Sequence, residues 1–406
     1  MNLSWSKMLA HSPSIESKHH HDIQSRNIRP GIITQAIRFI LILIGCPLYY
    51  INQNYYYAYM AMTKRSFGVF VTYLTQRWAP TVVRISGDSS VAGQLHTTKD
   101  GKVELLFPDR LVMVANHQLY SDWLYLWWVA YVNQSKSYGH FYIILKESLK
   151  YIPIIGWGMR FFSFIFLSRK LAIDEPRLSH RLGKLNKANY GPFSGGKGLD
   201  PMWLLLFPEG TNASQDGRNK SASWAKKIGV KDMENTLLPR SSGSFFCLNE
   251  LKDTVDYLYD CTIVYEGMKH GEFGQDNHTL QTMYLYGKPA PSVNMYWRRF
   301  ALSDIPLHDK EKFDEWLRNR WSEKDAIINQ YIATGRFPQT LAHEKVEKDI
   351  TQKEEKNYLE AEVKVDSYRD YLYVIIPILL CLGIFDLVKN LCNSGLILNL
   401  ARGRIL

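Results

Sequence analysis

The stretch LVMVANHQLYSD, residues 111–122, decides the fold that we predict for this chain. Its first five residues are all apolar, which is typical of a strand that is buried on both faces of a sheet. The residues that follow, SDWLYLWWVAYV at 121–132, have the length and composition of a helix. Because a buried strand followed by a helix is the repeating unit of α/β sheets, the stretch predicts an α/β fold.

Further apolar runs of strand length occur on both sides of this stretch. They are TVVRISGD (81–88), KVELLFP (102–108), FYIIL (141–145), FSFIFL (162–167), WLLLF (203–207) and CTIVY (261–265). Longer segments at 122–132 and 175–188 that can be helical separate several of these runs. Strands that alternate with helices favour a sheet with helices on both faces. We therefore expect a mixed sheet covered by helices, in a catalytic domain over residues 79–341.

An apolar segment precedes this domain. Residues 32–51 are nearly all apolar, and twenty helical residues reach about 30 Å, which is enough to span a bilayer. Arg38 and Pro47 interrupt the run, so a helix buried in the protein core stays open as the alternative. Residues 66–78 mix apolar and polar side chains and are expected to continue the anchor as an interfacial or core-facing helix. We predict a membrane anchor over residues 32–78.

The two ends of the chain differ in character. Residues 1–31 are polar and basic without an apolar stretch, which predicts a solvated tail and no secretory signal. Residues 342–370 are rich in Lys and Glu and predict a charged helix or linker. Residues 371–385 then carry no charge, but fifteen residues are short for a span. A tilted helix, a re-entrant piece and an interfacial hairpin therefore stay open for a membrane-associated segment at 371–406.

Charge and cysteine content limit the classes of partner. The net charge of +10 and the pI of about 9.1 suit an anionic partner. The basic residues are spread along the chain and the aromatic residues lie in or beside apolar stretches, which argues against nucleic acid. A membrane surface or a phosphorylated substrate fits better.

The five cysteines include no CxxC pair and no zinc spacing, so we predict no disulfide framework and no metal site.

His117 and Asp122 are the candidate catalytic pair. A carboxylate that accepts a hydrogen bond from one imidazole nitrogen raises the basicity of the other nitrogen, which can then deprotonate a hydroxyl. On one continuous helix a spacing of five residues would place the two side chains about 140° apart. The pair therefore requires His117 at or before the first turn, with Ser121 or Asn116 capping the helix. Taken alone, such a spacing often occurs by chance.

A second element, FPEGT at 207–211, ends another apolar strand and turns through Pro208 and Gly210. A glutamate on a tight turn at the end of a strand is well placed to bind the hydroxyls of a polyol. Glycine at such a turn lets a ligand approach the backbone closely. We therefore expect Glu209 and Gly210 to bind substrate.

Together these elements resemble the glycerolipid acyltransferase family, whose members acylate glycerol 3-phosphate, lysophosphatidic acid and other lysophospholipids. Asn116, His117 and Asp122 match its asparagine, histidine, four-residue gap and aspartate, and 207–211 matches its proline-glutamate-glycine-threonine element. The resemblance implies that the substrate-binding residues are Asn116, Lys146, Arg169, Glu209, Gly210, Thr211 and Pro239. Of these, Arg169 is similar to the arginine that contacts the substrate phosphate in that family.

The resemblance also implies a reaction. His117 acts as general base on a lysophospholipid hydroxyl, which attacks the thioester of acyl-coenzyme A directly, so acyl-CoA is a co-substrate and no cofactor is bound. The chain has no G-x-S-x-G motif and no cysteine beside a histidine that would favour an acyl-enzyme. A non-catalytic membrane scaffold and a lipid hydrolase stay open. The implied partner is a lipid bilayer, at the endoplasmic reticulum or, alternatively, a mitochondrial membrane or lipid droplet.

Two positions depart from the family pattern. Asn212 follows the threonine, where many members that act on lysophosphatidic acid have arginine, and Ser163 stands where glycine is frequent. The sequence is most similar to the branch that contains lysocardiolipin and fungal lysophosphatidylinositol acyltransferases. Since a phosphodiester carries less charge than a terminal phosphate, we expect Asn212 to favour lysophosphatidylinositol over lysophosphatidic acid. Lysophosphatidic acid stays open as the alternative acceptor.

Overall fold

The structure is a computed structural model that describes residues 45, 47–153, 155–168, 170–338 and 358–376, with isolated positions at 379, 383, 386 and 390. The chain divides into two compact units, one of residues 44–375 and one of residues 1–43 with 376–406. Nearly all the described residues belong to the unit 44–375. The fold described below is the fold of that unit.

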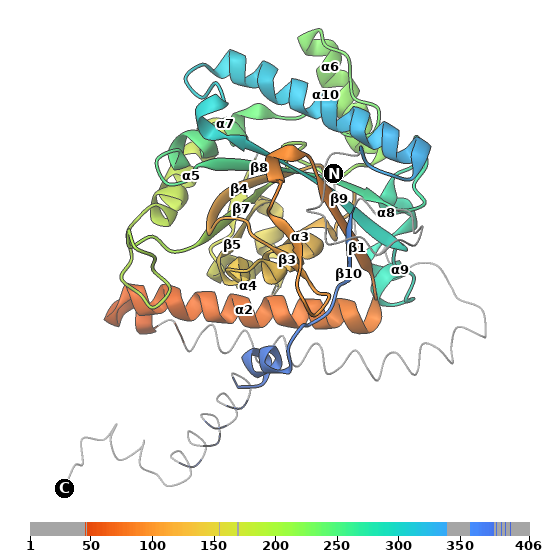
Figure 1. Cartoon of the computed structure of the whole chain (residues 1–406). Coiled ribbons are helices and arrows are strands. Elements are labelled where there is room, and N and C mark those ends of the chain that lie inside the picture. Colours follow the sequence, from red (N-terminus) through yellow and green to blue (C-terminus); the bar gives the residue numbers. More distant parts are fainter. Residues whose placement is uncertain are drawn as a thin grey trace, which may run out of the picture. The chain divides into compact units, whose positions relative to one another are not determined.

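An eight-stranded mixed sheet forms the centre of the unit (Figure 1). Its strands lie in the order β10-β1-β9-β8-β4-β7-β5-β6. Their bounds are β1 Val82–Gly87, β4 Arg110–Ala115, β5 Phe141–Lys146, β6 Ile165–Leu167, β7 Met202–Leu206, β8 Tyr257–Tyr265, β9 Ser292–Ala301 and β10 Leu359–Glu362. The strands from β8 to β6 are parallel to their neighbours, whereas β9 is antiparallel to β8 and β10 is antiparallel to β1. The prediction of an α/β fold with a mixed sheet is confirmed.

Helices cover both faces of this sheet (Figure 1). Their bounds are α2 Gln53–Trp78, α3 Asp122–Val132, α4 Ile155–Phe161, α5 Leu171–Leu185, α6 Gln215–Ile228, α7 Ser241–Leu251, α8 Gly274–Asn277, α9 Leu280–Tyr284 and α10 Lys310–Thr334. On one face, Trp127 of α3 stacks on Phe141 of β5 with 5.4 Å between ring centroids. A small sheet of β2 (Leu95–Thr97) and β3 (Val103–Leu105) lies apart from the main one.

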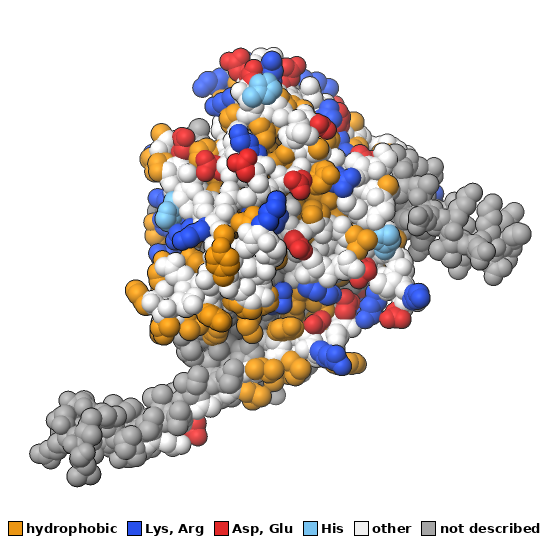
Figure 2. Space-filling view, turned by 60° about the vertical axis from the view of Figure 1, so that its left-hand side comes forward, with side chains coloured by type: hydrophobic (Ala, Val, Ile, Leu, Met, Phe, Trp, Pro, Cys, Tyr) orange, Lys and Arg blue, Asp and Glu red, His pale blue; other side chains and the backbone are white. Residues whose placement is uncertain are grey.

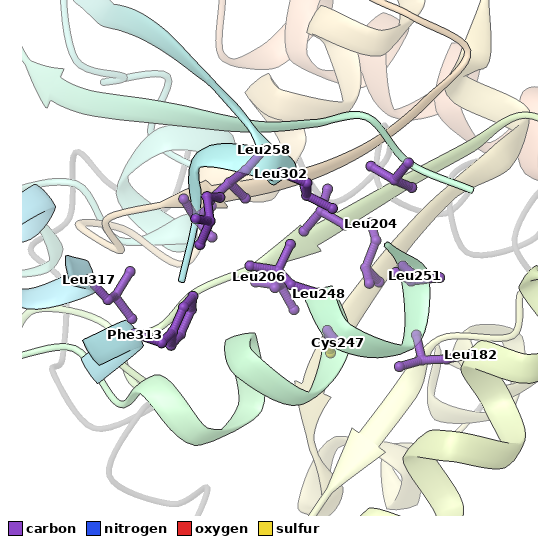
Figure 3. Packing of buried hydrophobic residues seen from close by; sticks show 14 of the residues in the cluster. Leu182, Leu204, Leu206, Cys247, Leu248, Leu251, Leu258, Leu302, Phe313 and Leu317 are labelled. Atoms are coloured by element: carbon purple, nitrogen blue, oxygen red, sulfur yellow. The ribbon is translucent and has the colours of Figure 1, made fainter. Parts of the chain in front are cut away.

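The other face carries the hydrophobic core beneath α5, α7 and α10 (Figure 3). Alternate side chains of the central strands point into it, because successive residues of a strand face opposite sides of the sheet. The cluster includes Val112 and Val114 of β4, Leu204 and Leu206 of β7, Leu182 of α5, Leu248 of α7 and Phe313 of α10. Burying each of these side chains contributes ~1.5–3 kcal/mol. This packing makes the central strands a rigid support for the loops that follow their carboxyl ends.

The helix α2 includes residues 66–78, which were expected to continue a membrane anchor. One side of it packs on the domain, where the Phe67 and Trp127 ring centroids are 5.3 Å apart and a Cβ at Gly68 would lie only 3.0 Å from the Trp127 Nε1 atom. Another side exposes Tyr55 and Met62. Figure 2 shows hydrophobic side chains along the lower edge of the molecule, where α2 lies in Figure 1. No helix within the described part of the chain is long and apolar enough to cross a membrane.

The predictions for the two ends fall largely on residues that the structure does not describe. The tail at 1–31, most of the apolar segment 32–51 and most of 371–406 lie outside the described residues. Within 342–370, predicted as a charged helix or linker, the structure describes only 358–370. There the chain forms β10, which pairs with β1 at the edge of the sheet. A strand was not expected there because its sequence, LEAE, has only two apolar residues and lies at an exposed edge.

Candidate active site

The candidate catalytic and substrate-binding residues follow two neighbouring parallel strands. In the pairing of β4 with β7, Val114 lies opposite Leu206. His117 and Glu209 each come three residues after this pair, so both lie beyond the carboxyl ends of their strands. In open α/β sheets this edge is where ligands bind. The register of the sheet therefore brings together two elements that are more than 90 residues apart in sequence.

His117 lies before the first turn of α3, as the spacing argument requires. Its Nδ1 atom is 2.9 Å from Oδ2 of Asp122, the first residue of the helix. Because an ionised carboxylate only accepts, Nδ1 carries the hydrogen and Nε2 is the nitrogen that can take a proton. The His117 side chain is 17% exposed, whereas Asp122 is fully buried. This arrangement can perform general base catalysis.

Asp122 is held from several directions. The backbone amides of Gln118 and Leu119 donate to its Oδ2 atom, at 2.7 and 3.0 Å. The hydroxyl of Tyr265, at the end of β8, donates to Oδ1 at 2.5 Å. Burial and the nearby Asp122 raise the pKa of Tyr265 well above its ordinary value, which keeps the phenol protonated and donating. Tyr265, Asp122 and His117 thus form one hydrogen-bonded chain.

Tyr265 was not identified from the sequence. It ends the run CTIVY, which was recognised as a strand, but nothing in that run pairs it with an aspartate 143 residues earlier. The pairing arises because β8 lies next to β4, with Cys261 opposite Ala115. Only the order of the strands could have revealed this contact.

Asn116 was predicted to bind substrate or to cap α3, and the structure gives it another partner. Its amide nitrogen donates to the carbonyl of Ile263 at 2.9 Å, and its side-chain oxygen accepts from the Ile263 amide at 2.8 Å. The residue is fully buried. Ser121 occupies the N-cap position, yet its side chain makes no capping bond. Asn116 therefore ties the end of β4 to β8, and the expected cap is wrong because Asp122 itself receives the loop amides.

The loop after β7 packs directly on His117. The ring of Phe207 stacks on the imidazole, with 4.1 Å between centroids and 19° between planes. The backbone amide of Ala213 donates to the His117 carbonyl at 2.7 Å. Gly210 has a φ of 71°, in the region that glycine adopts without strain, so the tight turn predicted from its sequence is confirmed. These contacts fix the distance between the base and the loop that carries Glu209.

Glu209 is buried and has few partners. The exposed fraction of the residue is 6%, and Nε1 of Trp321 donates to its Oε1 over a long 3.4 Å. Burial raises the pKa of its carboxyl to about 8, although Trp321, the charge of Lys324 and backbone hydrogen bonds at His117 and Leu237 act in the other direction. A buried carboxyl with incomplete partners can accept hydrogen bonds from the hydroxyls of a ligand.

The remaining predicted residues lie around this edge. Lys146 is the exposed last residue of β5, the strand next to β7. Thr211 is half-buried on the loop after Glu209, and Pro239 is buried next to Arg240, whose backbone amide donates to the Pro208 carbonyl at 2.7 Å. Arg169 lies outside the described residues. The structure thus gathers the other predicted residues at one end of the sheet, and their substrate contacts stay predictions.

Asn212 is placed differently from what the acceptor argument assumed. Its residue is 7% exposed, and its amide nitrogen donates to the side-chain oxygen of Gln275 on α8. An arginine here would lose that bond and need room for a guanidinium in a buried position. The expectation that Asn212 itself sets the preference among phosphate groups therefore has no support from its surroundings.

Comparisons with known proteins fit this geometry. A family model described as acyltransferase matches residues 86–266, and one described as acyltransferase C-terminus matches residues 283–361. A 2-acyl-1-lysophosphatidylinositol acyltransferase of Saccharomyces cerevisiae is 40% identical over 68% of this chain and 75% of its own length. An uncharacterized acyltransferase of Schizosaccharomyces pombe is 38% identical over 73% of this chain and 81% of its own length.

A more distant relative, the lysocardiolipin acyltransferase 1 of Danio rerio, is 28% identical over 56% of this chain and 53% of its own length. Together with the two family models, these similarities confirm the resemblance seen in the elements around His117 and Glu209. The chain belongs to the acyltransferase family.

Proposed function

We propose that this protein transfers an acyl group from acyl-coenzyme A to the free hydroxyl of lysophosphatidylinositol. The observation that carries the proposal is the chain Tyr265–Asp122–His117, which orients the imidazole and leaves Nε2 to act on a substrate. Beside it lies the buried carboxyl of Glu209, on a loop that stacks against the same imidazole.

The reaction needs one base. Nε2 of His117 takes the hydroxyl proton as the lipid oxygen attacks the thioester carbonyl, and Asp122 stabilises the imidazolium that forms. When the C–S bond breaks, the coenzyme leaves as a thiolate, to which the imidazolium returns the proton. Because a thiol has a pKa near ~8.5, it leaves without a strong general acid.

An acyl-enzyme on cysteine has no support among the described residues. Cys247 and Cys261 are fully buried, and burial raises the pKa of each thiol far above its ordinary value. A nucleophilic cysteine needs the opposite, an exposed thiol with a lowered pKa. Direct transfer from the thioester to the lipid is therefore the favoured mechanism.

The similarity to the Saccharomyces enzyme supports lysophosphatidylinositol as acceptor. A second candidate is lysophosphatidic acid, because a probable 1-acyl-sn-glycerol-3-phosphate acyltransferase of Arabidopsis thaliana is 32% identical over 57% of this chain. We favour the inositol lipid because its relative is the more similar and because Glu209 can accept hydrogen bonds from polyol hydroxyls.

One experiment separates these functions. Purified protein is supplied with one acyl-CoA and equal surface concentrations of several lysophospholipids, and the products are identified by mass spectrometry. The proposal predicts phosphatidylinositol as the main product, with release of free coenzyme A. A higher kcat/KM for lysophosphatidic acid would overturn the assigned acceptor, free fatty acid without diacyl product would indicate a hydrolase, and no thiol release would indicate a scaffold.

A lipid bilayer is the proposed partner, at the endoplasmic reticulum membrane. The exposed Tyr50 and Ile51 just before α2, and the exposed Tyr55 in its first turn, support contact with a lipid surface, where aromatic side chains are enriched. We expect the protein to sediment with membranes and to resist extraction by high salt or carbonate. Release by salt alone would show that electrostatic attraction, rather than apolar contact, holds it there.

A further inference from the structure

The helix α10 lies in the segment matched by the acyltransferase C-terminus model, outside the one that matches residues 86–266, yet it reaches the candidate active site. Figure 1 shows it crossing the same face of the sheet as α7. Its core-facing residues include Phe313, Leu317 and Trp321, spaced four residues apart as one face of a helix requires. The same helix buries two charged side chains, those of Lys324 and Asp325, one turn beyond Trp321.

Trp321 makes the direct contact. Its indole is fully buried in the core cluster, and Nε1 donates to Oε1 of Glu209 at 3.4 Å. A buried indole N–H normally finds a partner, and an ionised carboxylate is a strong acceptor. The contact therefore restricts the rotation of the Glu209 carboxyl.

Lys324 places a positive charge behind the site. Its Nζ atom is 2.5 Å from Oδ1 of Asp260 and donates to the carbonyl of Cys261 at 2.6 Å. Cys261 is paired with Ala115, the last residue of β4, two residues before His117. Arg298 binds the second oxygen of Asp260 at 2.6 Å, so the buried aspartate has two cationic partners. Arg298 also pairs with Glu323 at 2.7 Å, so Lys324 is the charge that favours an ionised carboxyl at Glu209.

Asp325 fixes the loop that leads to Leu237. Its carboxylate accepts the backbone amides of Glu234, Asn235 and Thr236, each at 2.8–2.9 Å. The next residue, Leu237, supplies a backbone hydrogen bond to Glu209. Three side chains of α10 therefore act on the surroundings of a single carboxyl group.

From this arrangement we propose that Trp321 and Lys324 of α10 are positioning residues that orient the carboxyl group of Glu209 and favour its charged form, so that it can receive the polar headgroup of the acceptor lipid. The proposal rests on the proposed function, since it assigns Glu209 to the acceptor. His117 after β4 and Lys324 on α10 act on this carboxyl directly, and Lys324 is linked through Asp260 on β8 and Arg298 on β9 to Glu323 on α10.

The test compares Trp321→Phe with Trp316→Phe. Both residues are tryptophans of α10, but Trp316 packs on Phe300 and Phe313, away from Glu209. We expect Trp321→Phe to lower kcat/KM for the lysolipid about 10-fold, mainly through KM, because one hydrogen bond to a charged group is lost. The rise of kcat/KM with pH should also move to higher pH, since the carboxyl loses a donor that favours its charged form. Trp316→Phe should leave both unchanged.

Lys324→Met should also move the rise of kcat/KM to higher pH. The thermal midpoint of each variant shows whether the variant folds. Identical KM values and pH profiles for the two tryptophan variants would overturn the proposal. A second measurement does not depend on activity. At pH 9, Trp321→Phe should destabilise the protein less when combined with Glu209→Gln than alone, and equal effects would also overturn it. If the wild type makes no diacyl product but the two substitutions are coupled in stability, the proposed function fails, whereas the contact between Trp321 and Glu209 is supported.

Discussion

Two buried carboxyl groups, Asp122 and Glu209, lie at the same edge of the sheet and are held in different ways. Asp122 accepts hydrogen bonds from His117, Tyr265 and two backbone amides within 3.0 Å. Glu209 has one side-chain donor, Trp321, at a longer 3.4 Å, besides backbone hydrogen bonds at His117 and Leu237, and burial still raises its pKa to about 8. The difference indicates that Asp122 is saturated and serves to orient the base, whereas Glu209 keeps capacity for a ligand.

The largest effect is expected on the Asp122 side. His117→Ala should lower turnover by roughly 10² to 10⁴-fold, the usual contribution of a positioned general base. The thermal midpoint and membrane association should change little, because the imidazole is partly exposed and contributes little to the core. Single-turnover rates with acyl-CoA and lysolipid are the measurement. Near-normal turnover would remove His117 from the mechanism.

On the other side, Glu209→Gln should lower kcat/KM by about 10–100-fold at pH 9, where the wild-type carboxyl is charged, because a charged acceptor is replaced by a neutral one. It should also change how stability depends on pH. Because the folded pKa of about 8 lies above the ordinary 4.5, the wild-type carboxyl costs stability increasingly as pH rises between these values. The variant lacks this cost, so its advantage in thermal midpoint should grow from pH 5 to pH 8 and then level off.

Thermal unfolding of both proteins over pH 5 to 9 tests the second part of this prediction. An advantage that stays constant with pH would mean that Glu209 titrates in its ordinary range. In that case the two carboxyl groups would differ in their hydrogen-bond geometry, and the raised pKa of Glu209 would be wrong.

A smaller effect is expected for Tyr265→Phe, which removes one of four donors to Asp122. Loss of a hydrogen bond to a charged group predicts a fall in kcat of about 10-fold, with KM for acyl-CoA unchanged. Tyr259→Phe on the same strand is the matched control, because its hydroxyl bonds to Gln94 instead. Equal kcat values for the two variants would show that the hydroxyl of Tyr265 does not support the base.

The smallest effect concerns Ser163, which has a φ of 60° in the turn between α4 and β6. A side chain in this left-handed region costs about 1 kcal/mol, a cost that glycine does not have. Ser163→Gly should therefore stabilise the fold by up to ~1 kcal/mol without changing kcat/KM, as measured by denaturant unfolding. A destabilised variant would show that the Ser163 side chain makes compensating contacts.

Much of the fold could be predicted because its signals are local. The apolar runs that became β4, β5, β7 and β8 are short and continuous, as buried strands are, and α3 begins at the predicted Asp122. In contrast, no strand was assigned to β9 and no helix to α10. The β9 sequence, SVNMYWRRFA, contains charges that are paired only after β8 and α10 are in place.

The sequence by itself determined the α/β class, the pair His117 and Asp122, and the turn at Gly210, because each follows from residues close together in the chain. Tertiary structure alone decided that Asn116 binds Ile263, that Asn212 binds Gln275, and that Tyr265 and Trp321 reach the two carboxyl groups. The physical reason is that a polar side chain bonds to whichever group the strand order and helix packing place within about 3 Å, and that neighbour is distant in sequence.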